Sequence, residues 1–383
     1  MKASWRTADP HDGYFECVRY FNTSGPCDPE RNYMLPPEPR LPGVRGLAEQ
    51  GLYFVVHAPR QTGKTTTLAA LARDITAAGQ QAALLFSCER ARVYAGDVGA
   101  AGREVLQAIT QAAENQWLPA ECLPPPEWPQ APPGSLLSAG LQAWARSCPR
   151  PLVLFFDEFD ALSGQALLSI ASQLRDGFRF RPRSFPASVG LCGLRDIRDY
   201  RSAAGQAPEP RVTSTSPFNI VDESFRLGNF TRKQVAALYG QHTADTGQEF
   251  TTEAVDRAFT YTQGQPWLVN ALAREVTVKM GVRPPEPVTA AHIDTAKERL
   301  ILARATHIDY LADRLAEPRV KKIIEPLVAG DFVSNDPTYN DDVSYVRDLG
   351  LIRESRPIAI ANPLYNEVIV RYLAEPRASS PGT

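Results

Sequence analysis

Hydrophobic residues in this chain form two kinds of pattern, short unbroken runs and longer stretches with helical spacing. The unbroken runs Tyr53–Val56, Ala82–Cys88 and Pro151–Phe156 have the length of strands. Continuous apolar runs suit strands that are buried on both faces of a parallel sheet. Ser188–Gly193 and Phe225–Leu227 are expected to add further strands. The first part of the chain is therefore predicted to be α/β, with a parallel-sheet core.

Amphipathic stretches separate these strands. Apolar positions three and four apart predict helices over Val44–Gln50, Gly102–Gln116, Ser135–Arg146 and Gln165–Asp176. From Thr231, a plausible N-cap, the pattern becomes wholly helical, over Thr231–Thr246, Thr252–Tyr261, Trp267–Met280 and His292–Leu315.

The last part of the chain combines helices with short extended pieces. Helices are expected at Val320–Ala329, Asp341–Leu349 and Pro363–Leu373, and extended pieces at Leu351–Arg353 and Pro357–Ala361. Two helices, a wing and a further helix are the order of a winged helix-turn-helix.

The first strand runs into a stretch with phosphate-binding character. It is followed by Ala58-Pro59-Arg60-Gln61-Thr62-Gly63-Lys64-Thr65-Thr66 and then by a helical pattern. This strand, loop and helix match the context of a P-loop, in which Gly63 permits close backbone approach, Lys64 reaches the β/γ-phosphates and Thr65 offers a hydroxyl to Mg²⁺. Ala58 replaces the first glycine of the pattern, which a small residue tolerates if its φ is negative.

A second acidic motif supports this interpretation. The strand Pro151–Phe156 ends in Asp157 and Glu158, at the carboxyl end where parallel sheets place their ligands. Asp157 is expected to hold Mg²⁺, and Glu158 to orient or deprotonate the attacking water. The alternative is a buried strand followed by a solvated acidic turn, with no chemical role. With the P-loop upstream, the two motifs predict a nucleotide-binding protein.

Composition bounds the other classes of function. The chain of 383 residues is 43% hydrophobic and 22% charged, with a net charge of −2, which gives no general reason to expect a nucleic-acid or membrane partner. Its six cysteines are far apart and form no C-x-x-C, so neither a zinc site nor a disulfide framework is indicated. No signal peptide or run of about 20 apolar residues is present, and a cytoplasmic protein is expected.

Three segments allow two interpretations each. Tyr33, Met34 and Leu35 either stack on the adenine or cap the hydrophobic core. The proline-rich stretch from Leu118 to Gly134 is either a partner motif or, as favoured, a passive connection. The segment Phe178–Phe185 interleaves Arg with Phe and is either a phosphate-binding patch or, as favoured, a connector whose Phe residues anchor in the core.

With these motifs located, the chain resembles the AAA+ superfamily, and most closely the branch that holds the STAND signalling ATPases and the origin-recognition initiator ATPases. The resemblance implies a segment over residues 1–50 that covers the nucleotide site, a P-loop ATPase core over 51–228, a helical lid over 229–288 and a winged-helix domain over 289–383. It is strongest at Gly63-Lys64-Thr65 and at Asp157-Glu158.

The resemblance also implies roles for residues outside the two main motifs. Arg195 falls where STAND proteins place a sensor that touches the γ-phosphate, although a surface Arg paired with a nearby Asp remains the alternative. Pro266, in Gly264-Gln265-Pro266, matches the G-x-P motif that sets the lid against the nucleotide. Arg274 is a candidate second sensor, and Arg211 lies roughly where AAA+ proteins keep an arginine finger.

Three functions follow as hypotheses. The favoured one is an ATP-hydrolysing switch of the STAND type, acting on a protein partner or by self-association. The second is a DNA-binding initiator or transposition regulator, for which the segment from Glu317 to Thr383 is a poor electrostatic match, with eight Lys/Arg against ten Asp/Glu. The third, a nucleotide-binding scaffold without turnover, is disfavoured by Glu158.

Overall fold

A five-stranded parallel sheet forms the core of the protein, in the order β2-β3-β4-β1-β5. The computed structural model describes residues 19–194, 219–303, 311, 313–331 and 341–374. The strands are β1 (Tyr53–His57), β2 (Ala82–Ser87), β3 (Leu152–Asp157), β4 (Ser188–Gly193) and β5 (Val221–Arg226). The predicted parallel sheet is confirmed, and β5 begins four residues earlier than expected from its apolar residues because its first half is polar and partly exposed at the sheet edge.

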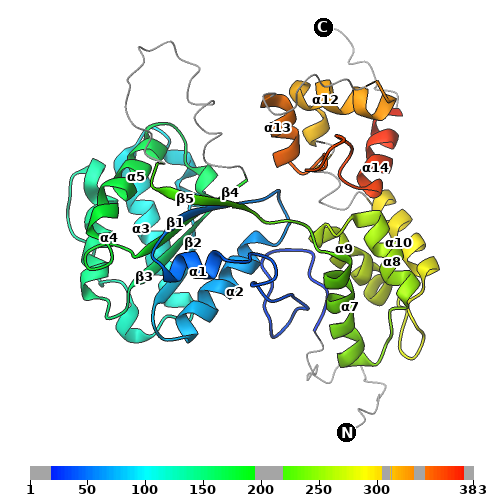
Figure 1. Cartoon of the computed structure of the whole chain (residues 1–383), viewed down its shortest axis with the longest axis horizontal. Coiled ribbons are helices and arrows are strands. Elements are labelled where there is room, and N and C mark those ends of the chain that lie inside the picture. Colours follow the sequence, from blue (N-terminus) through cyan, green and yellow to red (C-terminus); the bar gives the residue numbers. More distant parts are fainter. Residues whose placement is uncertain (1–18, 195–218, 304–310, 312, 332–340, 375–383) are drawn as a thin grey trace, which may run out of the picture.

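Two layers of helices cover the sheet, as Figure 1 shows. One face carries α1 (Val44–Glu49) and α2 (Lys64–Ala77), and the other carries α3 (Val98–Asn115), α4 (Leu136–Ser147) and α5 (Gly164–Gly177). Successive strand residues point to opposite faces. In β3, for example, Leu154 and Phe156 pack toward α3–α5, whereas Val153 and Phe155 pack toward α1 and α2. Both faces are buried, which explains the unbroken apolar runs.

The second half of the described chain is helical. It comprises α7 (Arg232–Thr246), α8 (Thr252–Thr262), α9 (Pro266–Arg274), a π-helical turn (Glu275–Lys279) and α10 (Ala290–Leu302), here called the helical region. Thr231 caps α7 as predicted, in a capping box with Gln234. The expected continuous helix to Leu315 is wrong, because α10 ends at Leu302, where the apolar stripe breaks and the leucine side chain is 74% exposed.

Helices α12 (Pro318–Ala329), α13 (Asp341–Asp348) and α14 (Pro363–Ala374) form what we call the C-terminal unit. An isolated antiparallel bridge joins Ile352 to Ile360 between α13 and α14. The elements thus follow the order expected for helix, helix, wing and helix. The winged-helix assignment itself stays a prediction.

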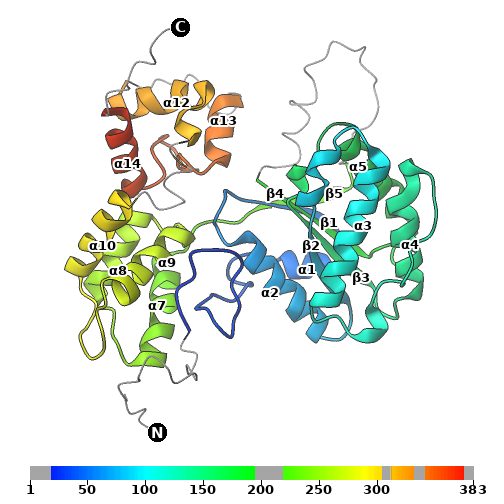
Figure 2. The same cartoon turned by 180° about the vertical axis from the view of Figure 1, so that it is seen from behind.

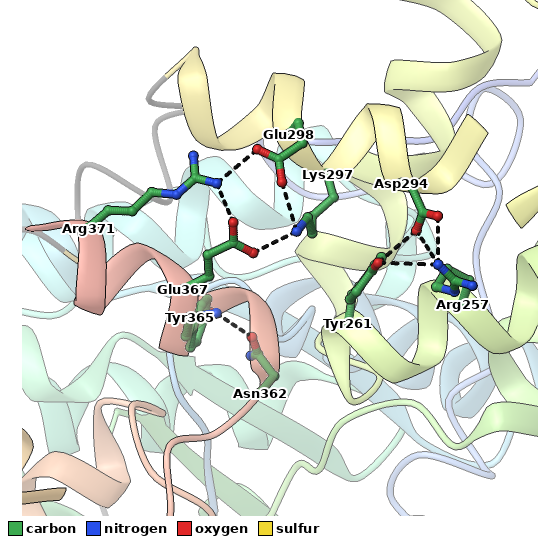
Figure 3. Close-up of polar contacts among 9 residues, drawn as sticks. All are labelled: Arg257, Tyr261, Asp294, Lys297, Glu298, Asn362, Tyr365, Glu367 and Arg371. Atoms are coloured by element: carbon green, nitrogen blue, oxygen red, sulfur yellow. Dashed lines mark hydrogen bonds and ion pairs between the residues drawn. The ribbon is translucent and has the colours of Figure 1, made fainter. Parts of the chain in front are cut away.

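One hydrophobic cluster is shared by the helical region and the C-terminal unit, with Leu268 and Leu300 on one side and Ile324 and Leu364 on the other. Ion pairs reinforce this joint, as Figure 3 shows. The ammonium of Lys297 lies 2.6 Å from Glu367 and 2.9 Å from its neighbour Glu298, and Arg371 bonds the same two carboxylates. The α10–α14 joint therefore combines apolar burial with a four-residue charge network.

The C-terminal unit also contacts the sheet domain. Arg226, the last residue of β5, lies 2.7 Å from Glu354 and 3.8 Å from Asp348, and donates a 2.9 Å hydrogen bond to the carbonyl of Arg347. At Gly350, a Cβ atom would lie 2.8 Å from the Pro59 side chain. The end of α13 is therefore packed directly on the loop that follows β1.

The N-terminal segment from Arg19 to Gly43 lies between the sheet domain and the helical region, on the side of α2 and α7 seen in Figure 2. The indole of Trp267 donates to the carbonyl of Thr23 at 2.8 Å, and the backbone N–H of Cys27 donates to Thr66 at 3.0 Å. A salt bridge joins Arg19 to Asp245 at 3.0 Å. The segment thus ties the two halves of the chain together.

The structure favours the connector interpretation of two further segments. In the Phe178–Phe185 segment, Phe185 is fully buried, and Arg181 stacks on the Phe178 ring at 3.4 Å and donates to the Phe178 carbonyl. In the proline-rich segment, Trp128 donates to Thr110 at 3.0 Å and packs near Trp144. Both segments are packed on the α/β domain.

None of the helices in the described ranges is long and apolar enough to span a membrane.

A substitution at Gly264 tests the close packing of this residue on the backbone of Phe230. Its φ is +73°, and an added Cβ would lie 1.8 Å from the carbonyl oxygen of Phe230, whose N–H is bonded to the Gly264 carbonyl. We expect Gly264→Ala to lower the free energy of unfolding by more than about 3 kcal/mol, because backbone must move. Urea denaturation followed by circular dichroism measures this change.

The matched control is Gly240→Ala in α7, where a Cβ meets nothing within 4 Å. There the change is expected to stabilise by about 0.5–1 kcal/mol, since Ala loses less entropy than Gly in a helix. Equal unfolding midpoints for the two variants would contradict the close approach at Phe230.

Candidate functional site

A cavity of about 320 Å³ lies at the carboxyl ends of β1 and β3. This is at the lower end of the roughly 300–1,000 Å³ found for ligand pockets. Its walls come from the loop after β1 with the start of α2, from the end of β3, from the N-terminal segment, and from the helical region with the residue Phe230 that precedes it. Of the residues predicted from sequence, the cavity wall includes Pro59, Arg60, Gln61, Gly63, Lys64, Thr65, Thr66, Asp157, Glu158 and Pro266.

The loop between β1 and α2 is held by its own hydrogen bonds. The N–H of Ala58 donates to the Gly193 carbonyl at 3.2 Å, and the Thr62 hydroxyl donates to the Pro59 carbonyl at 2.8 Å. Gln61 and Gly63 take positive φ angles, 60° and 79°, whereas Ala58 is not among the residues with positive φ. The small residue in place of the first glycine therefore fits as expected. Ala58 and Thr62 support the loop rather than line the cavity.

Lys64 begins α2, so the loop leads directly to a helix N-terminus, where free N–H groups favour an anion. Its ammonium donates to the Gly193 carbonyl at 2.8 Å and lies 3.9 Å from an oxygen of Asp157. The side chain is 14% exposed. A cation held at a helix N-terminus beside a cavity is suited to binding phosphate.

Thr65 and Asp157 meet across the site although they lie 92 residues apart. The Thr65 hydroxyl donates to Asp157 Oδ2 at 2.6 Å, and Asp157 Oδ1 accepts the N–H of Glu158 at 2.9 Å. The Asp157 side chain is almost wholly buried. A hydroxyl and a carboxylate fit the preference of Mg²⁺ for a few protein oxygens, with phosphate and water completing its shell.

Glu158 follows in a left-handed conformation, with φ 52°, which ends the extended strand. Its carboxylate accepts a hydrogen bond from Ser87, the last residue of β2. Because β2 and β3 are paired in parallel with Ser87 opposite Asp157, strand register alone brings this hydroxyl to the site. Sequence analysis missed Ser87, which stands at the end of an expected strand without any motif to mark it.

The helical region closes another side of the cavity. Pro266 is the first residue of α9, and Trp267 and Asn270 line the cavity beside it. The side chain of Gln265 donates to the carbonyl of Gln61 at 3.3 Å. The Gly264-Gln265-Pro266 element therefore touches the P-loop through its middle residue.

The N-terminal segment supplies Tyr33, Met34 and Leu35 to the cavity wall. The Tyr33 ring also packs on Phe21 at 4.8 Å, and its hydroxyl contacts His242, so the residue both lines the cavity and caps the adjoining core. Burial raises the pKa of Tyr33 to about 12, which keeps the phenol protonated at neutral pH. Both interpretations of this segment are thus compatible with the geometry.

Three arginines remain of the candidates that the sequence offered. Arg274 donates to the hydroxyl of Thr23 at 3.0 Å and is not among the residues that line the cavity. Arg195 and Arg211 lie outside the described residues. Arg40, which sequence analysis did not single out, lines the cavity from the N-terminal segment.

Two cysteines lie behind the acidic motif. Cys88 and Cys192 are wholly buried, and desolvation raises the pKa of both thiols well above the usual value, with the charge of Asp157 adding to the shift. A neutral thiol is a poor metal ligand and a poor nucleophile. The polar chemistry of the site therefore rests on its hydroxyls, its carboxylates and its cations.

Comparisons with solved structures identify the fold. The Walker-type ATPase of Pyrococcus abyssi matches with a TM-score of 0.60 at 13% identity, over 91% of this chain and 99% of that chain. The ORC2 protein of Aeropyrum pernix matches at 13% identity with a TM-score of 0.47, over 88% and 91%. The RuvB branch migration motor of Thermotoga maritima matches at 14% identity with a TM-score of 0.44, over 87% and 92%.

No protein-family model matches this chain, and no curated protein matches it. The first of these structural likenesses, together with the parallel sheet, shows that this chain shares the α/β fold of that Walker-type ATPase. At 13% identity it concerns the fold alone.

Removing the Lys64 ammonium tests the phosphate site. We expect Lys64→Ala to weaken binding of Mg-ATP by at least roughly 100-fold, because the β/γ-phosphates lose their main charge partner. Isothermal titration of the full chain measures the affinity. Lys233→Ala, an exposed lysine on α7, is the control and should bind as the parent does. Equal affinities for parent and Lys64→Ala would contradict the site.

Proposed function

We propose that this protein is an ATP-binding and ATP-hydrolysing molecular switch of the AAA+/STAND type. The observation that carries the proposal is the meeting of Lys64, Thr65, Asp157 and Glu158 around one cavity. That cavity is walled by the N-terminal segment and by Pro266 of the helical region. A bound nucleotide would therefore contact the sheet domain, the N-terminal segment and the helical region at once.

The residues divide the chemistry between them. The N-terminus of α2 and the Lys64 ammonium attract the β- and γ-phosphates. Thr65 and Asp157 would hold Mg²⁺, which when bound neutralises phosphate charge and orients the oxygens for in-line attack. Glu158, positioned by Ser87, would orient or deprotonate the attacking water.

The switch rests on contacts that start at the P-loop. Gln61 is bonded by Gln265 of the helical region, and Pro59 packs on Gly350 of the C-terminal unit. The P-loop thus touches both neighbouring parts of the chain. A change in phosphate occupancy that moved this loop would alter both contacts, and nucleotide state would bias how these parts are arranged.

The partner of such a switch is proposed to be a protein or a second copy of the chain. DNA is less well supported by the charge of the C-terminal unit. Its α13 carries Asp341, Asp342 and Asp348 against Arg347 alone. Two cations on α12 are already engaged, since Arg319 and Lys322 both pair with Asp342, at 3.3 Å and 3.1 Å.

Glu158→Gln tests turnover. The variant keeps the shape of the side chain but cannot accept a proton, so it should retain ATP affinity and lose hydrolysis by about 100-fold or more. A coupled phosphate-release assay measures the rate. Ser87→Ala, which removes only the hydroxyl that holds Glu158, should lose less, roughly tenfold. Hydrolysis at the parental rate by Glu158→Gln would overturn the catalytic assignment.

The same variant tests the switch. Small-angle scattering of Glu158→Gln with ATP should differ from that of the parent with ADP, because the trapped triphosphate favours a different arrangement of the domains. Identical scattering curves would leave an ATPase but remove the switch from the proposal.

Duplex binding separates the two partner classes. We expect the full chain to show no binding to a labelled DNA duplex by fluorescence anisotropy at about 150 mM salt, where nonspecific phosphate contacts are already weak. Micromolar binding that weakens steeply as salt is raised would reverse the order of the two hypotheses and place the initiator first.

A further inference from the structure

Arg40 is a buried cation that has no carboxylate partner in the part of the chain that the structure describes. It lies in the N-terminal segment just before α1, and its side chain is nine-tenths buried beside the P-loop. Among the residues that the structure describes, no carboxylate is paired with this guanidinium, and burial alone lowers its pKa to about 10. A buried charge without a counter-charge is costly and is retained where something else neutralises it.

The groups that bond or stack on Arg40 within the described residues are all uncharged. One terminal nitrogen, Nη1, donates to the Thr62 carbonyl at 3.0 Å and lies 3.4 Å from the Thr67 hydroxyl. The other, Nη2, donates to the Gly228 carbonyl at 2.8 Å. The guanidinium also lies over the ring of Phe230, 4.7 Å from its centroid. Carbonyls, a hydroxyl and an aromatic face stabilise the cation without neutralising it.

These neighbours belong to two separate parts of the chain. Thr62 is in the P-loop and Thr67 in the first turn of α2, whereas Gly228 and Phe230 lie in the connection between β5 and α7. This connection leads from the sheet domain to the helical region. Arg40 therefore links the P-loop to the connection through the two terminal nitrogens of one planar group.

The cavity is the place where a counter-charge can enter. Arg40 lines it together with Lys64 and Thr65, and it lies so close to the P-loop that a Cβ on Gly63 would be 3.1 Å from its Nη1. Lys64 has Asp157 at 3.9 Å, whereas Arg40 has no such carboxylate among the described residues. A polyphosphate in the cavity would bring several negative charges to this side of the loop.

We propose that Arg40 is a positioning residue whose missing counter-charge is the polyphosphate of a bound nucleotide, and that it couples occupation of the phosphate site to the connection between β5 and α7. The inference rests on the proposed nucleotide site. It assigns a regulatory contact to a residue that carries no recognisable motif.

The charge is tested by Arg40→Met, which keeps length and apolar bulk. We expect Mg-ATP affinity to fall at least roughly tenfold, Mg-ADP affinity to fall less, and AMP affinity to change by less than about threefold, because the effect follows the phosphate charge. Isothermal titration of the full chain provides the three affinities. Arg45→Met is the control, since Arg45 lies in the neighbouring α1, partly exposed and paired with Glu49 at 2.9 Å.

Thermal unfolding distinguishes this role from a purely structural one. Without nucleotide, Arg40→Met should melt no lower than the parent, because it removes an uncompensated buried charge, while the rise in Tm produced by ATP should shrink. A variant that melts much lower without nucleotide yet keeps the full ATP-induced rise would overturn the proposal. An equal loss of affinity for ATP and AMP would overturn it as well.

Arg40→Lys tests the coupling and serves also if the methionine variant fails to fold. It keeps the charge but loses the planar fork that reaches both carbonyls. The affinity of this variant for ATP should stay within about fivefold of that of the parent. Trypsin cleaves after Arg226 and Arg232, and ATP is expected to protect the connection between them in the parent. In Arg40→Lys this protection should be lost. Protection equal to that of the parent would refute the coupling.

The nucleotide site and the role of Arg40 can be disproved separately. A parent chain that binds no ATP, or a Lys64→Ala variant that binds normally, removes the nucleotide site and the role of Arg40 with it. ATP affinity of Arg40→Met equal to that of the parent, with Lys64→Ala impaired, overturns the role of Arg40 alone.

Discussion

The hydrogen bond between Thr65 and Asp157 is the contact on which the site depends. It joins the start of α2, which follows β1, to the end of β3. The strands β1 and β3 are not neighbours in the sheet, because β4 lies between them. The hydrogen bond forms only if all three strands are buried in register with their carboxyl ends at one edge. The apolar runs that build the sheet therefore also determine where a hydroxyl, a carboxylate and an ammonium come together.

The P-loop is also in contact with the N-terminal segment, the helical region and the C-terminal unit. Arg40 contacts it from the N-terminal segment, Gln265 from the helical region and Gly350 from the C-terminal unit. Each contact is small and polar or tightly packed, in contrast to the broad hydrophobic cluster that joins the helical region to the C-terminal unit. Polar contacts of this kind can be exchanged at modest free-energy cost, whereas an apolar core cannot be opened without exposing it to water.

For the proposed switch, this contrast indicates where movement would occur. The helical region and the C-terminal unit share a core and the charge network around Lys297 and Glu367, so they are best regarded as one body. The sheet domain is a second body with its own two cores. The two bodies are joined by the connection at Gly228, by the salt bridge between Arg226 and Glu354, and by the N-terminal segment. A nucleotide bound between the two bodies would act on these polar links.

The sequence by itself determined the elements and the two phosphate-site motifs. Unbroken apolar runs marked β1, β2 and β3, and Thr231 marked the start of α7, because burial on both faces and local capping leave direct traces in residue order. The polar first half of β5 left no such trace. It could not determine the partners of side chains that carry no motif. Ser87 reaches Glu158 only through the β2–β3 register, and Arg40 reaches Gly228 across 188 residues. Such contacts depend on how separate elements pack in three dimensions, which no local pattern encodes, and so only the tertiary structure decided them.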